Sequence, residues 1–191
     1  MPRVLITCGS ARRASWNQRL ARAAEALARE AGAETTFVDP ATLPLPLYDG
    51  DLEARDGLPE NARTWKRLFA DHDGLLLACP EYNGSITPLL KNLIDWASRR
   101  EGDEAPLVAF RGRTAGLLAT SPGALGGLRG LAHVRAILSG LGVHVVPDQL
   151  AVPLAPQALG EDGTVLDPKV AARLGEVVGR FVETTRRLAL R

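Results

Sequence analysis

Short apolar runs alternate with longer segments of helical period along nearly the whole chain. Five runs are rich in β-branched or aliphatic residues, which predicts strands within residues 3–8, 35–39, 74–80, 114–123 and 143–147. Strong helix formers predict helices at residues 17–31, 59–70, 88–98, 126–141 and 170–190. Strands that alternate with helices form a parallel sheet with right-handed crossovers and helices on both faces. We therefore expect an α/β fold with three layers around a doubly wound, five-stranded parallel sheet.

Two segments between these elements are expected to lack regular structure. Residues 40–51, PATLPLPLYDGD, contain three prolines, and residues 99–106, RREGDEAP, are strongly polar. Proline removes a backbone donor, and polar runs are typical of solvated loops. Both segments are therefore predicted to be loops.

Length and charge narrow the class of protein. The chain has 191 residues, of which 46% are hydrophobic and 24% charged, so a single domain over residues 1–191 is expected. Its 23 basic and 22 acidic residues give a net charge of +1, which predicts a small-molecule partner rather than nucleic acid or a membrane. No stretch has the character of a signal peptide or a membrane span, and this favours a cytoplasmic protein. The two cysteines, Cys8 and Cys79, are expected to be buried and reduced.

Three distinctive loops follow the first, third and fourth predicted strands. In doubly wound folds, ligands bind beyond the carboxyl ends of the strands, near the point where the strand order reverses. The loops at residues 9–17, 80–83 and 121–127 are therefore the candidate binding site.

The first loop has the composition of an anion site. GSARRASWN, residues 9–17, offers a glycine for a tight turn, short polar side chains and a fixed positive charge directly before a helix. A helix N-terminus carries partial positive charge and unpaired N–H groups, which suits a phosphate. Helix capping by serine or asparagine explains one of these residues but not all of them. The loop matches neither the dinucleotide fingerprint nor the Walker P-loop.

The second and third loops are less specific when each is taken alone. PEYN, residues 80–83, places a proline, an acid, an aromatic and an amide where a buried strand ends, and the alternative is a plain strand-to-helix turn. TSPGALGG, residues 120–127, would let the backbone approach a ligand closely, and it too could be only a turn. The three histidines pair with no nucleophilic serine or cysteine in the sequence pattern, and no metal-ligand cluster appears. We therefore expect structural histidines, no metal and no catalytic side chain.

Together the loops resemble the NAD(P)H-dependent FMN reductase family, which includes related quinone, azo-dye and chromate reductases. GSARRASWN, PEYNGSITPLLKNLIDW and TSPGALGG carry the resemblance, at residues 9–17, 80–96 and 120–127. It implies a flavodoxin-like fold in which the first loop holds the FMN phosphate and the second edges the flavin ring. The residues that it assigns to FMN in these two loops are Ser10, Arg12, Ser15, Trp16, Asn17, Pro80, Glu81, Tyr82 and Asn83. In the third loop, Ser121 and Gly123 are expected to let the backbone approach the far edge of the ring.

Two further expectations concern residues around the ring. A carboxylate close to a reduced, anionic flavin is unfavourable, so Glu81 is expected to orient its loop or a subunit contact. On the following helix, Lys91, Asn92, Asp95 and Trp96 recur at spacings of three and four and are expected to serve packing and an interface.

The resemblance also implies an activity. NADPH or NADH would reduce FMN, leave, and be replaced by a small acceptor such as free flavin, a quinone or an azo compound, which is a ping-pong mechanism. The implied assembly is a homodimer or homotetramer whose flavin pockets are completed across the interface. Neither the donor, the acceptor nor the strength of FMN binding follows from the motifs.

Two other classes of protein share parts of the pattern. A flavodoxin-like electron carrier has the same fold, but its phosphate loop is hydroxyl-rich and its surface usually acidic, which this chain lacks. A non-enzymatic nucleotide-binding regulatory domain would give a colourless preparation that does not oxidise NADPH or NADH.

Overall fold

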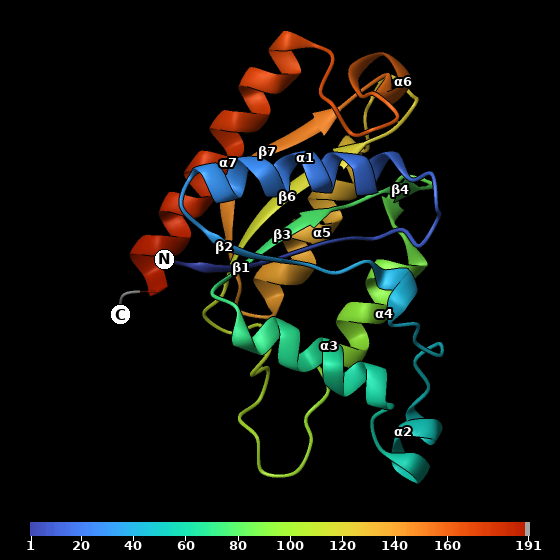
Figure 1. Ribbon diagram of the computed structural model, residues 1–191. Helices are drawn as coiled ribbons and strands as arrows, with labels where there is room; N and C mark the ends of the chain where they lie inside the picture. The colour runs from blue at the N-terminus through green and yellow to red at the C-terminus, as the bar shows by residue number, and fades with distance from the viewer. Residues whose placement is uncertain (190–191) are drawn as a thin grey trace.

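A five-stranded parallel sheet forms the centre of the molecule, in the order β2-β1-β3-β6-β7 (Figure 1). The structure is a computed structural model that describes residues 1–189. The strands are β1 (Arg3–Cys8), β2 (Glu34–Phe37), β3 (Gly74–Ala78), β6 (Thr114–Thr120) and β7 (His144–Val152). The order reverses between β1 and β3, so the loops after these two strands flank the place where doubly wound sheets bind ligands. The predicted fold class is confirmed.

Long helices cover both faces of this sheet (Figure 1). They are α1 (Trp16–Glu30), α3 (Glu60–Asp71), α4 (Pro88–Ala97), α5 (Leu128–Gly140) and α7 (Pro168–Ala189). Side chains alternate along the buried strand β1, so that Val4 and Ile6 pack in one core with α1 and α7, while Leu5 packs in the other with α3, α4 and α5. Because both faces are apolar, the central strands read as continuous hydrophobic runs in the sequence.

Several short elements were not predicted. They are a 3₁₀-helix (Pro40–Thr42), α2 (Gly50–Asp56), α6 (Ala155–Ala158), β4 (Glu81–Tyr82) and β5 (Ser85–Ile86). The expectation that residues 40–51 lack regular structure is therefore wrong at both ends of that segment. Asp39 caps the first helical turn by accepting from the Ala41 N–H at 2.9 Å, and Asp49 caps α2 by accepting from the Asp51 N–H at 2.8 Å. Proline at the start of a helical turn costs nothing, because its missing N–H would be unpaired there anyway.

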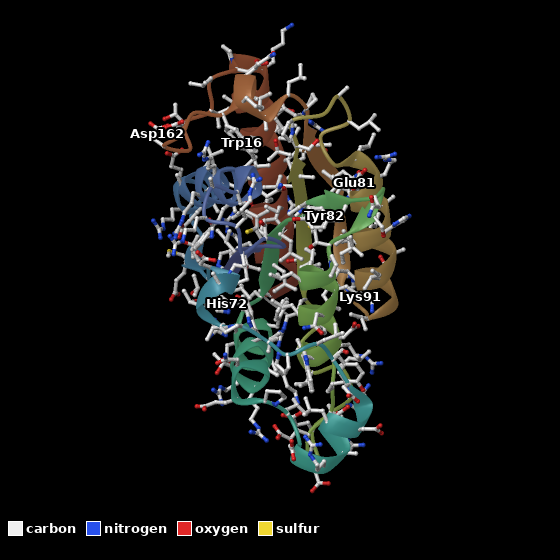
Figure 2. All side chains as sticks on the ribbon, turned by 90° about the vertical axis from the view of Figure 1, so that its right-hand side faces the viewer. Trp16, His72, Glu81, Tyr82, Lys91 and Asp162 are labelled. Atoms are coloured by element: carbon white, nitrogen blue, oxygen red, sulfur yellow. The ribbon has the colours of Figure 1, made fainter. Side chains whose placement is uncertain are left out.

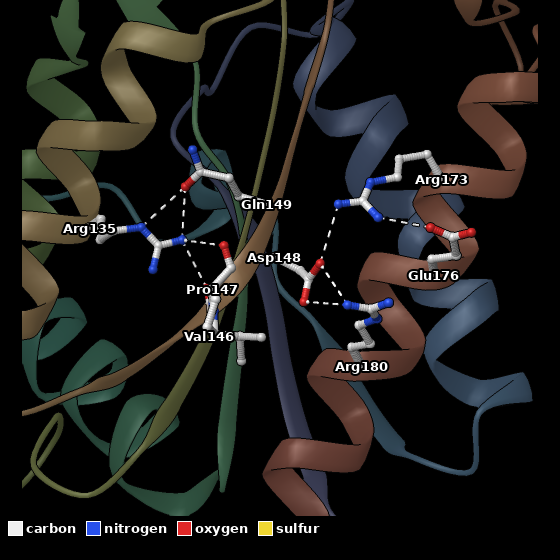
Figure 3. A network of polar contacts seen from close by, with 8 residues as sticks. All are labelled: Arg135, Val146, Pro147, Asp148, Gln149, Arg173, Glu176 and Arg180. Atoms are coloured by element: carbon white, nitrogen blue, oxygen red, sulfur yellow. Dashed lines mark hydrogen bonds and ion pairs between the residues drawn. The ribbon is translucent and has the colours of Figure 1, made fainter.

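The edge strand β7 is longer than the strand predicted at residues 143–147, and it carries a bulge. Between two successive pairs, the paired residue on β7 advances by four, from Val145 to Gln149, whereas the paired residue on β6 advances by two, from Ala115 to Leu117. The Arg135 guanidinium of α5 donates to the Val146 and Pro147 carbonyls and to the Gln149 side chain, as Figure 3 shows, and also to the Val145 carbonyl. On the other side of the strand, Asp148 accepts hydrogen bonds from two arginines of α7 (Figure 3). Side chains from two helices therefore stabilise the irregular strand.

Both cysteines are free and buried, as predicted. Burial raises the pKa of the Cys8 thiol to about 11 and also raises that of Cys79. Both thiols therefore stay protonated near neutral pH and are poor nucleophiles.

Within residues 1–189, none of the helices combines the length and the apolar character needed to cross a lipid bilayer.

Candidate functional site

The three predicted loops meet at the carboxyl end of the sheet and enclose a pocket of about 190 Å³. Trp16 and Tyr82, which come from the first and second loops, lie at the same end of the molecule (Figure 2). The pocket is lined by Ser10, Arg12, Ser15, Trp16, Asn17, Pro80, Glu81, Tyr82, Thr120, Ser121 and Pro122. Of the residues predicted for the flavin, Asn83 and Gly123 lie outside this lining.

The first loop and the start of α1 form a cradle for an anion. Ser15 is 3% exposed and caps the helix, since its Oγ accepts from the Gln18 N–H at 3.4 Å. The N–H groups of Trp16 and Asn17 lie in the first turn, where no helical carbonyl can accept them. The first turn contains no acidic residue, so nothing there repels an anion. The exposed Arg12 side chain adds a positive charge beside them. These groups fit the phosphate of FMN.

Asn17 holds two of the loops together. Its Nδ2 donates to the Thr120 carbonyl at 2.8 Å, and its Oδ1 accepts from the Thr120 N–H at 3.0 Å. The side-chain amide is thus held by the end of β6, and the backbone N–H of Asn17, in the first turn of α1, is available to a ligand. No local sequence pattern signals this contact, because the two residues are 103 positions apart.

The second loop is a β-hairpin rather than a simple turn. Strands β4 and β5 pair antiparallel, with Tyr82 opposite Ser85. The two residues between them, Asn83 and Gly84, have φ angles of 50° and 78°. Positive φ at both positions is the mark of a type I′ hairpin turn, for which Asn-Gly is the strongest short sequence signal. Asn83 therefore lies at an exposed hairpin tip.

Glu81 faces α5 at the base of this hairpin. Its carboxylate accepts from the Arg129 Nε at 2.8 Å and from the backbone N–H groups of Arg129 and Gly130 at 3.0 and 3.1 Å. Burial acts to raise the pKa of Glu81, but these hydrogen bonds outweigh it and hold the pKa below its ordinary value. The carboxylate is therefore ionised near neutral pH.

Two of the three histidines contact neighbouring elements of the fold. Ser85 Oγ and His133 Nδ1 are 2.8 Å apart and join β5 to α5. His72 is buried at the end of α3, where its ring nitrogens contact the Leu68 carbonyl and Thr36 Oγ1. Both rings hold neighbouring elements together.

A second cavity, of about 470 Å³, lies on the other side of the first loop. Its walls are mostly apolar and come from Ala11, from residues 40–47 and from α4. Asn92 and Trp96 of α4 fix this wall, since the Asn92 Nδ2 and the Trp96 Nε1 donate to the Pro46 carbonyl at 2.8 and 2.9 Å. Their predicted packing role is confirmed. The sequence does not predict this cavity, because the three prolines in residues 40–51 indicate a loop without regular structure.

Comparisons with known proteins agree with the geometry. The family profile described as NADPH-dependent FMN reductase matches residues 2–157. A 2-hydroxy-1,4-benzoquinone reductase from a Burkholderia species is 38% identical over 141 residues, which cover 74% of this chain and 72% of that protein. An NADPH:quinone oxidoreductase from Arabidopsis thaliana is 32% identical over 97% of this chain and 93% of its own. The solved structure of FerB, a flavoenzyme NAD(P)H:(acceptor) oxidoreductase from Paracoccus denitrificans, superposes with a TM-score of 0.81 at 29% identity and 98% coverage of both chains.

Proposed function

The chain belongs to the NADPH-dependent FMN reductase family, and on this premise we propose that it passes electrons from NADPH or NADH, through FMN in the three-loop pocket, to a small acceptor. It is therefore an oxidoreductase. The observation that carries the proposal is the meeting of the three loops around one pocket, with an anion cradle at one side.

The first two loops have separate parts in holding the cofactor. Ser10, Ser15 and the first N–H groups of α1 bind the phosphate, and Arg12 adds the charge that neutralises it. Pro80 and Tyr82 form an apolar and aromatic wall for the ring. When bound, FMN supplies the chemistry of accepting a hydride and releasing two electrons, so no side chain is needed as a nucleophile.

A quinone is the acceptor that we propose. The Burkholderia and Arabidopsis relatives are both named for quinone reduction. Tyr82 is 58% exposed at the pocket, which leaves an aromatic face for a flat, apolar acceptor.

Steady-state oxidation of NADPH and NADH by the purified protein tests the proposal. The assay is run with and without added FMN and with a benzoquinone, free flavin and an azo dye as acceptors. We expect turnover that requires FMN and follows ping-pong kinetics, with quinone the best acceptor. A protein that binds FMN but oxidises neither nicotinamide would instead be an electron carrier, and one that binds no FMN would be a regulatory domain.

Arg12→Ala is expected to weaken FMN binding by about ten- to a hundredfold, because it removes a charge-assisted contact to the phosphate. Arg13→Ala is the matched control, since Arg13 is also exposed but does not line the pocket. Quenching of flavin fluorescence measures both affinities. Equal losses in the two variants would contradict the assignment of Arg12, and equal affinity for riboflavin and FMN would contradict the phosphate cradle.

We further propose a homodimer, or a tetramer built from it, in which a second copy covers the apolar cavity beside the first loop. The cavity lies next to the anion cradle at Ala11, and Leu47 at its rim is 79% exposed. An apolar hollow with a protruding leucine fits a self-complementary contact.

Leu47→Asp is expected to shift the protein to the monomer at micromolar concentration, because it would bury an unpaired carboxylate at the interface. Leu166→Asp is the control, since Leu166 is also exposed and lies outside this cavity. Light scattering after size exclusion measures the mass of each variant. An unchanged mass for Leu47→Asp would place the interface elsewhere.

A cytoplasmic location is also proposed, in keeping with NADPH or NADH as donor. Cell fractionation tests it.

A further inference from the structure

Helix α5 holds the β4–β5 hairpin at two points one turn apart. At the first point, the Glu81 carboxylate accepts from the Arg129 side chain and from the backbone N–H groups of Arg129 and Gly130. At the second, His133 contacts Ser85. Residues 129 and 133 share one face of the helix, so a single helical face contacts both strands of the hairpin.

The backbones approach closely between these two points. A Cβ at Gly130 would lie 3.4 Å from both the Glu81 Cβ and the Ser85 carbonyl oxygen. The hairpin has only two residues in each strand, and so short a hairpin is not stable alone in water. Its position therefore depends on α5.

The first contact also balances a charge in the pocket wall. The Glu81 side chain is 7% exposed and lines the pocket, whereas the Arg129 side chain is 61% exposed and does not line it. Full reduction of FMN near neutral pH adds two electrons and one proton, which leaves a negative charge on the ring. A lone carboxylate nearby would oppose that charge, and a paired one opposes it much less.

We propose that Arg129 and His133 are positioning residues that fix the hairpin against the flavin pocket, and that Arg129 balances Glu81 so that the pocket does not disfavour reduced FMN. This inference rests on the proposed binding of FMN at the same pocket. In this proposal, α5 controls how the cofactor is bound, although it reaches the pocket only through the hairpin and the third loop.

The charge balance is tested by the ratio of the dissociation constants of reduced and oxidised FMN, obtained by redox titration of bound and free FMN. Arg129→Gln leaves Glu81 unpaired, so this ratio is expected to rise by about three- to tenfold. Glu81→Gln leaves Arg129 unpaired, so the ratio is expected to fall. The double variant and Arg129→Lys are each expected to stay within about twofold of the parent protein, because charge is balanced in both.

Arg55→Gln is the control for the loss of one positive charge. Arg55 forms an exposed ion pair with Asp56 on α2, which lies at the bottom of the view in Figure 1, away from the hairpin. The Arg55→Gln variant should therefore have the same ratio of dissociation constants as the parent protein. A purely structural role would move the ratio in the same direction in Arg129→Gln and Glu81→Gln, and that result would overturn the charge balance.

Hydrogen exchange of the FMN-free protein tests the positioning role separately. Arg129→Gln and His133→Ala should each speed exchange of the hairpin amides by about tenfold or more, while peptides from β3 and β6 stay protected. His133→Ala removes only an exposed side chain, so the variant should fold. Unchanged exchange in both variants would overturn the positioning role. Hydrogen exchange of the FMN-free protein needs no cofactor. A failure to bind FMN would therefore refute the proposed function, but the test of how α5 holds the hairpin would remain valid.

Discussion

Asn17→Leu is expected to lower the free energy of unfolding of the FMN-free protein by about 2 to 5 kcal/mol, because it leaves a buried donor and a buried acceptor without partners. Asn17 is 5% exposed, and its amide makes both of its hydrogen bonds to the backbone of Thr120. Leucine has nearly the same size but can neither donate nor accept. Urea denaturation followed by circular dichroism measures the loss.

The neighbouring Gln18→Leu is the matched control for the Asn17 variant. It makes the same kind of change one residue later, at a half-buried position. Its effect should stay within about 0.5 kcal/mol. Similar losses in the two variants would mean that the bonds to Thr120 contribute little to stability. The Asn17 variant should also bind FMN more weakly, since Asn17 holds Thr120, and Thr120 directly precedes the third loop of the pocket.

Asn17 illustrates what the sequence can and cannot predict about this site. The sequence predicts that Asn17 lies at the ligand-binding edge of the sheet, because it follows a strand in a polar loop and parallel strands bring their carboxyl ends to one edge. Its partner was not predictable, since a side chain that bonds a backbone 103 residues away leaves no local pattern. The sequence therefore predicts that the three loops meet, and the resemblance assigns Asn17 to the ligand, but only the structure reveals its supporting bonds to Thr120.

The hairpin at residues 81–86 was missed although a signal was present. Asn83-Gly84 is a strong turn signal, but the flanking strands have only two residues each, too short for a period-two pattern to appear. In contrast, the five strands of the main sheet and the long helices were predictable, because the strands form short apolar or β-branched runs and the helices repeat their period over several turns.

The bulge in β7 and the wall of the apolar cavity also depend on tertiary contacts. Arg135 stabilises the bulge from α5, and Asn92 and Trp96 shape residues 40–47 from α4. Local propensity predicted the opposite for both segments, a short strand and a loop without structure. Side chains distant in sequence decided these two regions.

Gly126→Ala is expected to lower the free energy of unfolding by about 3 to 5 kcal/mol, from a left-handed alanine together with overpacking. Gly126 has a φ of 59°, and a Cβ there would lie 2.5 Å from the carbonyl carbon of Val152 and 2.7 Å from the Pro153 nitrogen. These are backbone atoms, which cannot rotate away as a side chain can. The third loop must therefore move off the end of β7, and thermal and urea denaturation would record the loss.

Gly175→Ala is the control for the Gly126 variant, with the opposite sign. Gly175 lies within α7, and nothing comes within 4 Å of a Cβ placed there. Alanine at such a site should raise stability by about 0.5 to 1 kcal/mol, because glycine is a poor helix former. FMN binding should be unchanged in Gly175→Ala and weakened in Gly126→Ala, since Ser121 and Pro122 of the displaced loop line the pocket. If the Gly126 variant is as stable as the parent protein, the third loop can move away from β7 without cost. Close packing of Gly126 against β7 would then not be what holds this loop at the pocket.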